Sequence, residues 1–164
     1  MAMKYAIAAG LGWLCLSMSA LADDFRAQML EAHNGERALM GEPPLKWDPI
    51  LAAHAAGWAE HLAGMGRLEH DRGSGEGENL WMGDAGAYRP HTMVEDWIGE
   101  KVHFAYGTFP YVSRTRSWRD VGHYTQIIWR HTDRLGCAMT TANDWDYLVC
   151  RYRAPGNVVG EKPY

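Results

Sequence analysis

The sequence predicts an α+β fold built as one domain. Three segments, at residues 23–41, 49–66 and 90–106, carry apolar side chains at the three- and four-residue spacing of amphipathic helices. Residues 134–156 alternate apolar and polar side chains around a turn-forming "ANDW", which predicts a β-hairpin. Helices that precede paired strands, without regular alternation of the two, are typical of α+β folds. A length of 164 residues without internal repeats or a long linker suits one domain.

The N-terminal segment has the composition of a secretory signal peptide. One positive charge, Lys4, precedes an apolar stretch over residues 5–18, and the small-residue pattern "ALA" suits cleavage after Ala22. The alternative is a membrane anchor, but the apolar stretch is shorter than the ~20 residues that a spanning helix needs. We therefore expect a signal peptide at residues 1–22, a domain at 23–164, secretion to an extracellular or periplasmic compartment, and no stable membrane anchor.

Cysteine count and charge narrow the class of protein. Of three cysteines, Cys15 lies in the predicted signal peptide, which leaves Cys137 and Cys150 to form one disulfide in an oxidising compartment. Closing so short a loop stabilises a fold by roughly 3 kcal/mol on a chain-entropy estimate. The formal charge of −4, from 16 basic and 20 acidic residues, gives no reason to expect nucleic acid as a partner.

The first two predicted helices have recognisable ends. In the first, the acidic residues Asp23 and Asp24 stand at the start and Gly41 follows the end. The second is preceded by Asp48, a side chain that caps helix N-termini, and Pro49 suits the first helical position. We therefore expect two helices joined by the turn "GEPPLKW".

Two histidines, His54 and His61, stand seven positions apart on the second predicted helix. Such a pair can ligate a metal ion, but no acidic or sulfur partner lies at a matching spacing. We favour exposed positions on the flank of the helix for both side chains.

A glycine-rich stretch follows the second predicted helix. Glycines are frequent in residues 73–83, which predicts a turning loop that leads into a short strand near residues 79–82.

In the third predicted helix, at 90–106, Glu100 falls on the apolar side, where a carboxylate is costly unless it has a partner. The alternative is that Glu100 lies at the margin of the apolar stripe and reaches water.

Residues 107–121 predict an irregular loop rich in aromatic side chains, with Arg114, Arg116 and Arg119 spaced along it. A contact patch for a small anion or a carbohydrate is one interpretation. A solvated loop is the interpretation that we favour. The hairpin that follows would place the two remaining cysteines on adjacent strands.

Four ionisable residues stand out by their context: His70 before the glycine-rich loop, Glu78 at its end, Glu100, and His123 in "GHYTQ". Two imidazoles and two carboxylates suit either of two chemistries. The histidines could bind a divalent metal while the carboxylates orient the rings or a bound water. Alternatively, the four groups could exchange protons in general acid–base work. Sequence spacing alone does not bring them together.

A series of motifs resembles one protein family. "GHYTQIIWR" is followed by "RLGCA" and "YLVCRYRAPGNVVGEKPY", and the upstream motifs "AHNGER", "PLKWDPILAAHAAGWAEHLA", "LEH", "GENL" and "DWIGEK" occur in the family's order. Over residues 25–164 the sequence resembles the CAP superfamily (cysteine-rich secretory, antigen 5 and pathogenesis-related 1 proteins), which is defined by the SCP domain. It is most similar to the plant pathogenesis-related 1 type, whose chains close with a similar "GN..GE.PY".

The resemblance implies a three-layer α-β-α sandwich with a central antiparallel sheet. It also implies that His70, Glu78, Glu100 and His123 line one cleft as the family's tetrad of two histidines and two glutamates, the candidate catalytic residues. In some members the histidines bind zinc or another divalent cation, so His70 and His123 are the expected metal ligands. His123 would lie at the floor of the cleft, with the packed "IIW" run behind it.

One departure from the plant type concerns disulfides. Plant members carry three, whereas Cys137 and Cys150 allow one here. Plant members place a cysteine just before "GHYTQ", and Val121 occupies that position in this sequence. We expect the 107–121 loop to be less constrained, so a partner surface built on it does not carry over.

The resemblance leaves the activity open, because members have been linked to lipid or sterol binding, defence, signalling and proteolysis. We expect a module that binds a lipid, a sterol or a protein partner and holds a divalent metal ion. The alternative is a metal-dependent hydrolase or protease in which Glu78 or Glu100 activates a metal-bound water. The sequence lacks "GxSxG" and "HExxH" motifs, and Ser74 in "GSGEG" is typical of a turn. We therefore favour a protein that is not an enzyme.

Overall fold

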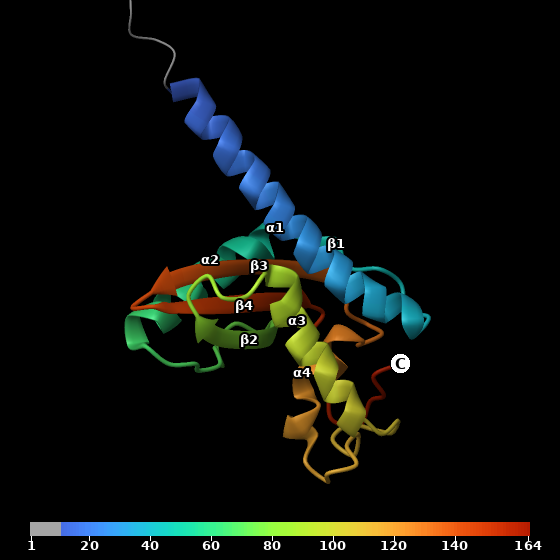
Figure 1. Ribbon diagram of the computed structural model, residues 1–164. Helices are drawn as coiled ribbons and strands as arrows, with labels where there is room; N and C mark the ends of the chain where they lie inside the picture. Colours follow the sequence, from blue (N-terminus) through green and yellow to red (C-terminus); the bar gives the residue numbers. More distant parts are fainter. Residues whose placement is uncertain (1–10) are drawn as a thin grey trace, which may run out of the picture.

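Helices cover both faces of one four-stranded sheet (Figure 1). The computed structural model describes residues 11–164, with side chains from Ala20 onward. The strands lie in the order β1-β3-β4-β2 and span Lys46–Trp47 (β1), Gly77–Asp84 (β2), Arg134–Ala142 (β3) and Trp145–Arg153 (β4). β2 and β3 each pair antiparallel with β4, whereas the short β1 pairs parallel with β3 at the edge.

The helices form the two outer layers. One face of the sheet packs against α2 (Pro49–Met65), and the other lies under α1 (Leu11–Leu39), α3 (Pro90–Gly99) and α4 (Gly122–Ile127). Two short 3₁₀ helices, η1 (Glu100–His103) and η2 (Trp118–Asp120), lie next to α4. This arrangement confirms the expected α-β-α sandwich, to which β1 adds a short parallel edge.

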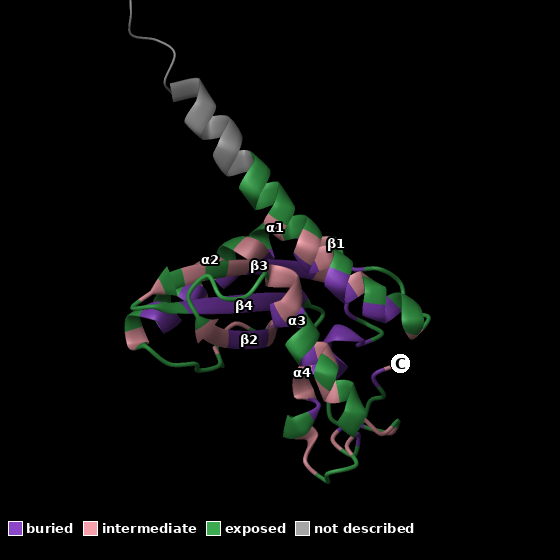
Figure 2. Cartoon of the chain, in the orientation of Figure 1, coloured by how far each residue is buried: buried purple, intermediate pink, exposed green. Residues whose placement is uncertain are grey.

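The central strand β4 is buried on both sides, as Figure 2 shows. Because side chains alternate along a strand, Tyr147 and Val149 face α2, whereas Leu148, Cys150 and Tyr152 face the helices of the other layer. The expected hairpin is confirmed. Its two strands pair without interruption along their whole length, from Arg134 opposite Arg153 to Ala142 opposite Trp145.

The predicted start of the second helix is also confirmed. The Asp48 carboxylate accepts hydrogen bonds from the backbone N–H of Ile50 at 2.8 Å and of Leu51 at 3.3 Å. These bonds satisfy two of the donors that a helix leaves free at its N-terminus. Gly66 closes the helix in the left-handed conformation, at φ 68°, which glycine adopts without strain.

The predicted disulfide joins the two strands of the hairpin. Cys137 and Cys150 lie directly opposite each other in the register, with Cα atoms 4.1 Å apart, and both are buried. The closed loop is short, with a sequence separation of 13.

Reduction of this disulfide is expected to lower the free energy of unfolding by about 2 to 3 kcal/mol, because the unfolded chain regains loop entropy. Urea unfolding with and without reductant measures the effect. The variant Cys150→Ala should match the reduced protein and show no further response to reductant. An equal response of the variant to reductant would contradict the assignment.

The residues after β4 return along the segment that precedes α4. The backbone N–H of Phe109 donates to Glu161, that of Gly160 donates to Phe109, and that of Arg130 donates to Pro163, at 2.8, 2.9 and 2.6 Å. The Asn157 side chain also donates to the carbonyl of Gly122 at 2.9 Å. We call residues 154–164 the C-terminal strap.

The first helix begins earlier than predicted. α1 runs from Leu11 without a break past Asp23, since "ALA" before the acidic pair consists of strong helix formers. Its N-terminal turns extend away from the sheet (Figure 1). Residues 1–10, the first part of the predicted signal peptide, lie outside the described residues. Among residues 11–164, no helix combines the length and apolar character needed to cross a bilayer.

The third helix is shorter than predicted, and the loop after it is more ordered. α3 ends at Gly99 and gives way to η1, after which Phe104 is extended and forms a β-bridge with Ser113. Much of the 107–121 segment is solvated, as we favoured, and Arg114, Arg116 and Arg119 are exposed. Its residues Phe109 and Val112 are buried in a small cluster that also contains a tryptophan next to α4. The predicted strand near 79–82 is part of the longer β2.

Candidate functional site

A cavity of about 520 Å³ lies between β2, α4 and the 107–121 segment. Three of the four predicted residues, His70, Glu78 and His123, line it. Glu100 does not line the cavity but contacts His123. The remaining wall consists of Asn79, Phe109, Trp118, Arg119, Gly122 and Asn157. Aromatic walls with a few polar groups are typical of small-molecule sites.

The first histidine–glutamate pair lies where the end of α3 meets the start of α4 in space. Glu100 directly follows the end of α3 at Gly99, and its side chain reaches the start of α4. Its Oε1 lies 2.6 Å from Nδ1 of His123, and its Oε2 accepts the backbone N–H of His123 and of Tyr124 at 3.0 and 3.1 Å. The His123 ring also stacks on Trp97, with centroids 5.8 Å apart. Glu100 therefore has the partners that its place in the sequence required.

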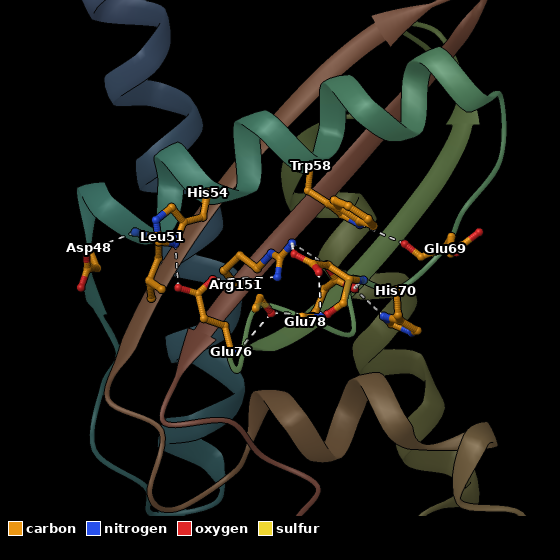
Figure 3. A network of polar contacts seen from close by, with 12 residues as sticks. Asp48, Leu51, His54, Trp58, Glu69, His70, Glu76, Glu78 and Arg151 are labelled. Atoms are coloured by element: carbon orange, nitrogen blue, oxygen red, sulfur yellow. Dashed lines mark hydrogen bonds and ion pairs between the residues drawn. The ribbon is translucent and has the colours of Figure 1, made fainter.

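The second pair joins the glycine-rich loop to β2. Glu78 Oε1 lies 2.6 Å from Nδ1 of His70 and accepts the backbone N–H of Asp71 at 3.2 Å. Its other oxygen, Oε2, lies 3.0 Å from Nη2 of Arg151, as Figure 3 shows. The Glu78 side chain is 6% exposed, whereas that of His70 is 60% exposed. A buried carboxylate thus holds an imidazole at the mouth of the cavity.

Both histidines are held in the same way. Each directs Nδ1 at a carboxylate, so the arrangement favours the tautomer in which Nδ1–H donates and Nε2 keeps its lone pair. Among the described residues, Nε2 of His70 and Nε2 of His123 have no hydrogen-bond partner. Two imidazole nitrogens on one cavity can bind a metal ion or accept a proton.

Comparison with known proteins identifies the family. The family model "Cysteine-rich secretory protein family" (CAP) matches residues 30–152. This chain belongs to the CAP family. It is 40% identical over 154 residues to pathogenesis-related protein 1C of Nicotiana tabacum, covering 93% of this chain and 88% of the relative. It is 37% identical over 160 residues to a pathogenesis-related protein 1 of Arabidopsis thaliana, covering 96% and 92%.

Solved structures agree with the CAP fold. A crystal structure of NaASP2 with Zn²⁺ superposes with a TM-score of 0.72 at 23% identity, over 85% of this chain and 84% of that one. The hookworm platelet inhibitor superposes with a TM-score of 0.69 at 21% identity, over 87% and 75%. At these identities the likeness concerns the fold. The resemblance to the pathogenesis-related 1 type is confirmed by the sequence matches.

His54 and His61, the two histidines on α2 of this CAP-family chain, do not form a shared site. His54 pairs with Glu76, Nδ1 to Oε1 at 2.8 Å, so it does have an acidic partner, which comes from the glycine-rich loop rather than from its own helix. His61 packs instead on the ring of Trp58, with centroids 4.6 Å apart. Spacing along α2 could not reveal Glu76, because the loop folds back over the helix.

Ser74 has the contacts of a turn residue. Its Oγ accepts the backbone N–H of Glu76 at 3.2 Å and donates to the carbonyl of Asp71 at 3.4 Å. It lines a separate, smaller cavity of about 300 Å³ together with His54 and Arg151. The structure thus places Ser74 apart from the cavity that His70 and His123 share.

Sequence reasoning missed Arg151. Its side chain is 1% exposed, within the run "YLVCRY" that alternates between the two faces of the sheet. A charged residue between buried neighbours of a central strand is the signal that could have pointed to it, since such a group is almost never buried without a partner. In this CAP-family chain those partners are carboxylates of the glycine-rich loop and of β2.

Proposed function

We propose that this CAP-family protein is secreted and binds a divalent metal ion, such as Zn²⁺, through Nε2 of His70 and Nε2 of His123. One observation carries the proposal: two imidazoles on one cavity each have Nδ1 at 2.6 Å from a glutamate oxygen. Carboxylates that hold the far nitrogen of a histidine are the usual outer contacts of zinc-binding histidines. The Zn²⁺ in the NaASP2 structure, a protein of the same fold, supports the choice of probe.

The two imidazole nitrogens suit a metal ion that is weakly held and keeps open coordination positions. Among residues 11–164, no three histidine, cysteine or carboxylate side chains are grouped closely enough to hold a metal together. Two imidazole nitrogens would therefore be the protein's ligands, and the other positions would be left to water or a ligand. Sites with such open positions can polarise or orient what binds there, whereas structural zinc sites are closed by four protein ligands.

The cavity has room for a small ligand. About 520 Å³ lies within the range of small-molecule sites, and Phe109 and Trp118 provide apolar surface beside the imidazoles. A second groove of about 400 Å³, between α1 and the edge of the sheet, includes Phe25, Trp47 and Met139 and suits the lipid or sterol that we expect as a partner. The two cavities have no lining residue in common.

We favour a binding protein over the alternative hydrolase. A carboxylate that activates a bound water must be free to take its proton. Both Glu78 and Glu100 are already engaged, each by an imidazole and by backbone N–H groups. The signal-peptide pattern and the buried disulfide support secretion, because disulfides persist in oxidising compartments.

Isothermal titration of the metal-stripped protein with Zn²⁺ is expected to show one-to-one binding that is lost in the double variant His70→Ala/His123→Ala. His91→Ala is the matched control, since His91 also lies near a carboxylate, that of Glu95 at 3.5 Å, but outside the cavity. Circular dichroism checks that all variants fold.

Undiminished Zn²⁺ uptake by the folded double variant would refute the metal site. The same double variant is expected to keep its affinity for a fluorescent sterol, because the apolar groove contains neither histidine. Sterol binding that disappears together with Zn²⁺ binding in a folded variant would contradict the separation of the two sites.

A further inference from the structure

Arg151 is a buried cation that contacts carboxylates from both sides of the glycine-rich loop. Figure 3 shows its guanidinium between Glu76 and Glu78. Nη2 lies 3.1 Å from Asp71 Oδ2 and 3.0 Å from Glu78 Oε2, and Nη1 lies 3.9 Å from Glu76 Oε2. The side chain is 1% exposed and also lies over the Trp58 ring, 5.8 Å from its centroid.

The contact with Glu78 matters because that carboxylate is buried. Its Oε1 faces His70, while its Oε2 is buried and has no hydrogen bond within the described part of the chain. The Arg151 guanidinium provides the positive charge that faces Oε2. A buried carboxylate that loses its counter-charge cannot keep its place without cost, because water does not reach it.

We propose that Arg151 is a positioning residue for the His70 half of the site, an inference that rests on the proposed metal function. By holding Oε2, the guanidinium turns Oε1 of Glu78 toward Nδ1 of His70. That bond fixes the ring so that Nε2 faces the cavity. Arg151 itself lines the smaller cavity beside Ser74 and does not line the larger one.

The other histidines provide internal references. His123 should not depend on Arg151, because backbone N–H groups of α4 hold Glu100 in place. His54 should respond less than His70, because Arg151 lies 3.9 Å from Glu76 but 3.0 Å from Glu78, so its charge acts less strongly on Glu76. A specific effect on His70 therefore separates positioning from a general loss of structure.

The test is the variant Arg151→Gln, compared with Arg153→Gln. Arg153 lies two residues further along β4 and also forms an ion pair, with Asp48 at 3.2 Å, but has no contact with the cavity. Long-range ¹H–¹⁵N spectra at pH 8 report the tautomer of each imidazole. We expect His70 to lose its preference for the Nδ1–H tautomer in Arg151→Gln alone, while His123 keeps it. Zn²⁺ affinity should fall about 10- to 100-fold, as for other outer contacts of metal-binding histidines.

An unchanged His70 tautomer in folded Arg151→Gln would overturn the inference, as would an equal change in Arg153→Gln. If Arg151→Gln does not fold, Arg151→Lys is judged by the same criteria, since one ammonium group keeps the charge but cannot hold both Asp71 and Glu78 as the guanidinium does. If the wild-type protein binds no Zn²⁺, the proposed function fails, and the tautomer measurement still decides the role of Arg151.

Discussion

Replacing Arg37 with methionine is expected to lower the free energy of unfolding by at least about 4 kcal/mol, which is enough to unfold many domains. Arg37 is 1% exposed and donates to four backbone carbonyls. Nε donates to Pro43 at 2.8 Å, Nη1 to Ile127 and Trp129 at 2.9 Å each, and Nη2 to Thr132 at 3.0 Å.

The expected loss is large because methionine would leave these carbonyls buried without donors. Each unsatisfied buried group costs about 1 to 3 kcal/mol. Two of the carbonyls belong to the end of α4 and the residues just after it, so the loss would also loosen the helix that carries His123. Burial lowers the pKa of Arg37, yet a guanidinium stays charged at neutral pH.

Urea unfolding followed by circular dichroism measures this effect. Arg26→Met is the matched control, because Arg26 lies on the same helix but pairs with Asp23 at the surface and should change stability by less than about 0.5 kcal/mol. A loss below about 1 kcal/mol in Arg37→Met would show that solvent or neighbouring donors replace the guanidinium.

A second large effect is expected in mild acid, through His33. Burial lowers the pKa of this imidazole from 6.5 to about 4. In the folded protein Nδ1 lies 2.7 Å from the Met29 carbonyl and Nε2 lies 2.8 Å from the Tyr152 hydroxyl, so the neutral ring fits as a donor to the first and an acceptor from the second. The folded state therefore resists protonation.

The sign follows from the two pKa values. Between pH 6.5 and about 4 the unfolded chain binds a proton at His33 that the folded protein does not, so stability falls as the pH falls. The loss of folding stability caused by His33 is absent above pH 7. It reaches about 3 kcal/mol below pH 4, because each unit of difference between the two pKa values is worth 1.36 kcal/mol.

Urea unfolding at several pH values from 7 to 4.5 is the measurement. His33→Gln should remove most of the pH dependence in this range, because an amide can serve both partners without titrating. His91→Gln, at a partly exposed position, is the matched control and should leave the slope unchanged. A slope that persists in His33→Gln would assign the acid sensitivity to another group.

Local patterns predicted much of the fold because they act over short distances. The cap at Asp48, the alternation of β4 and the disulfide between the hairpin strands all depend on residues close in the sequence. The predicted helix at 90–106 was too long, because Phe104, the residue after η1, pairs with a residue of the next loop. The spacing of apolar residues in a helix does not reveal such a pairing with a later segment.

The site was harder to predict, since its pairs join separate elements. Nothing in the spacing of Glu100 and His123 shows that α4 begins beside the end of α3. The resemblance to a family brought the four residues together, and their roles in metal binding or catalysis stay predictions. Buried arginines were missed for a general reason: a sequence pattern treats arginine as exposed, whereas the partners of Arg37 and Arg151 come from distant segments.

The C-terminal strap makes the shape of the cavity depend on residues that mostly lie outside it. Phe109, which forms part of the wall, is held by backbone hydrogen bonds to Gly160 and Glu161, and Tyr164 packs against Tyr106. Substitutions in the strap are thus expected to alter the shape of the cavity while the histidines and glutamates stay the same. For practical work, an affinity tag or reporter fused after Tyr164 would be attached to the segment that holds Phe109 in place.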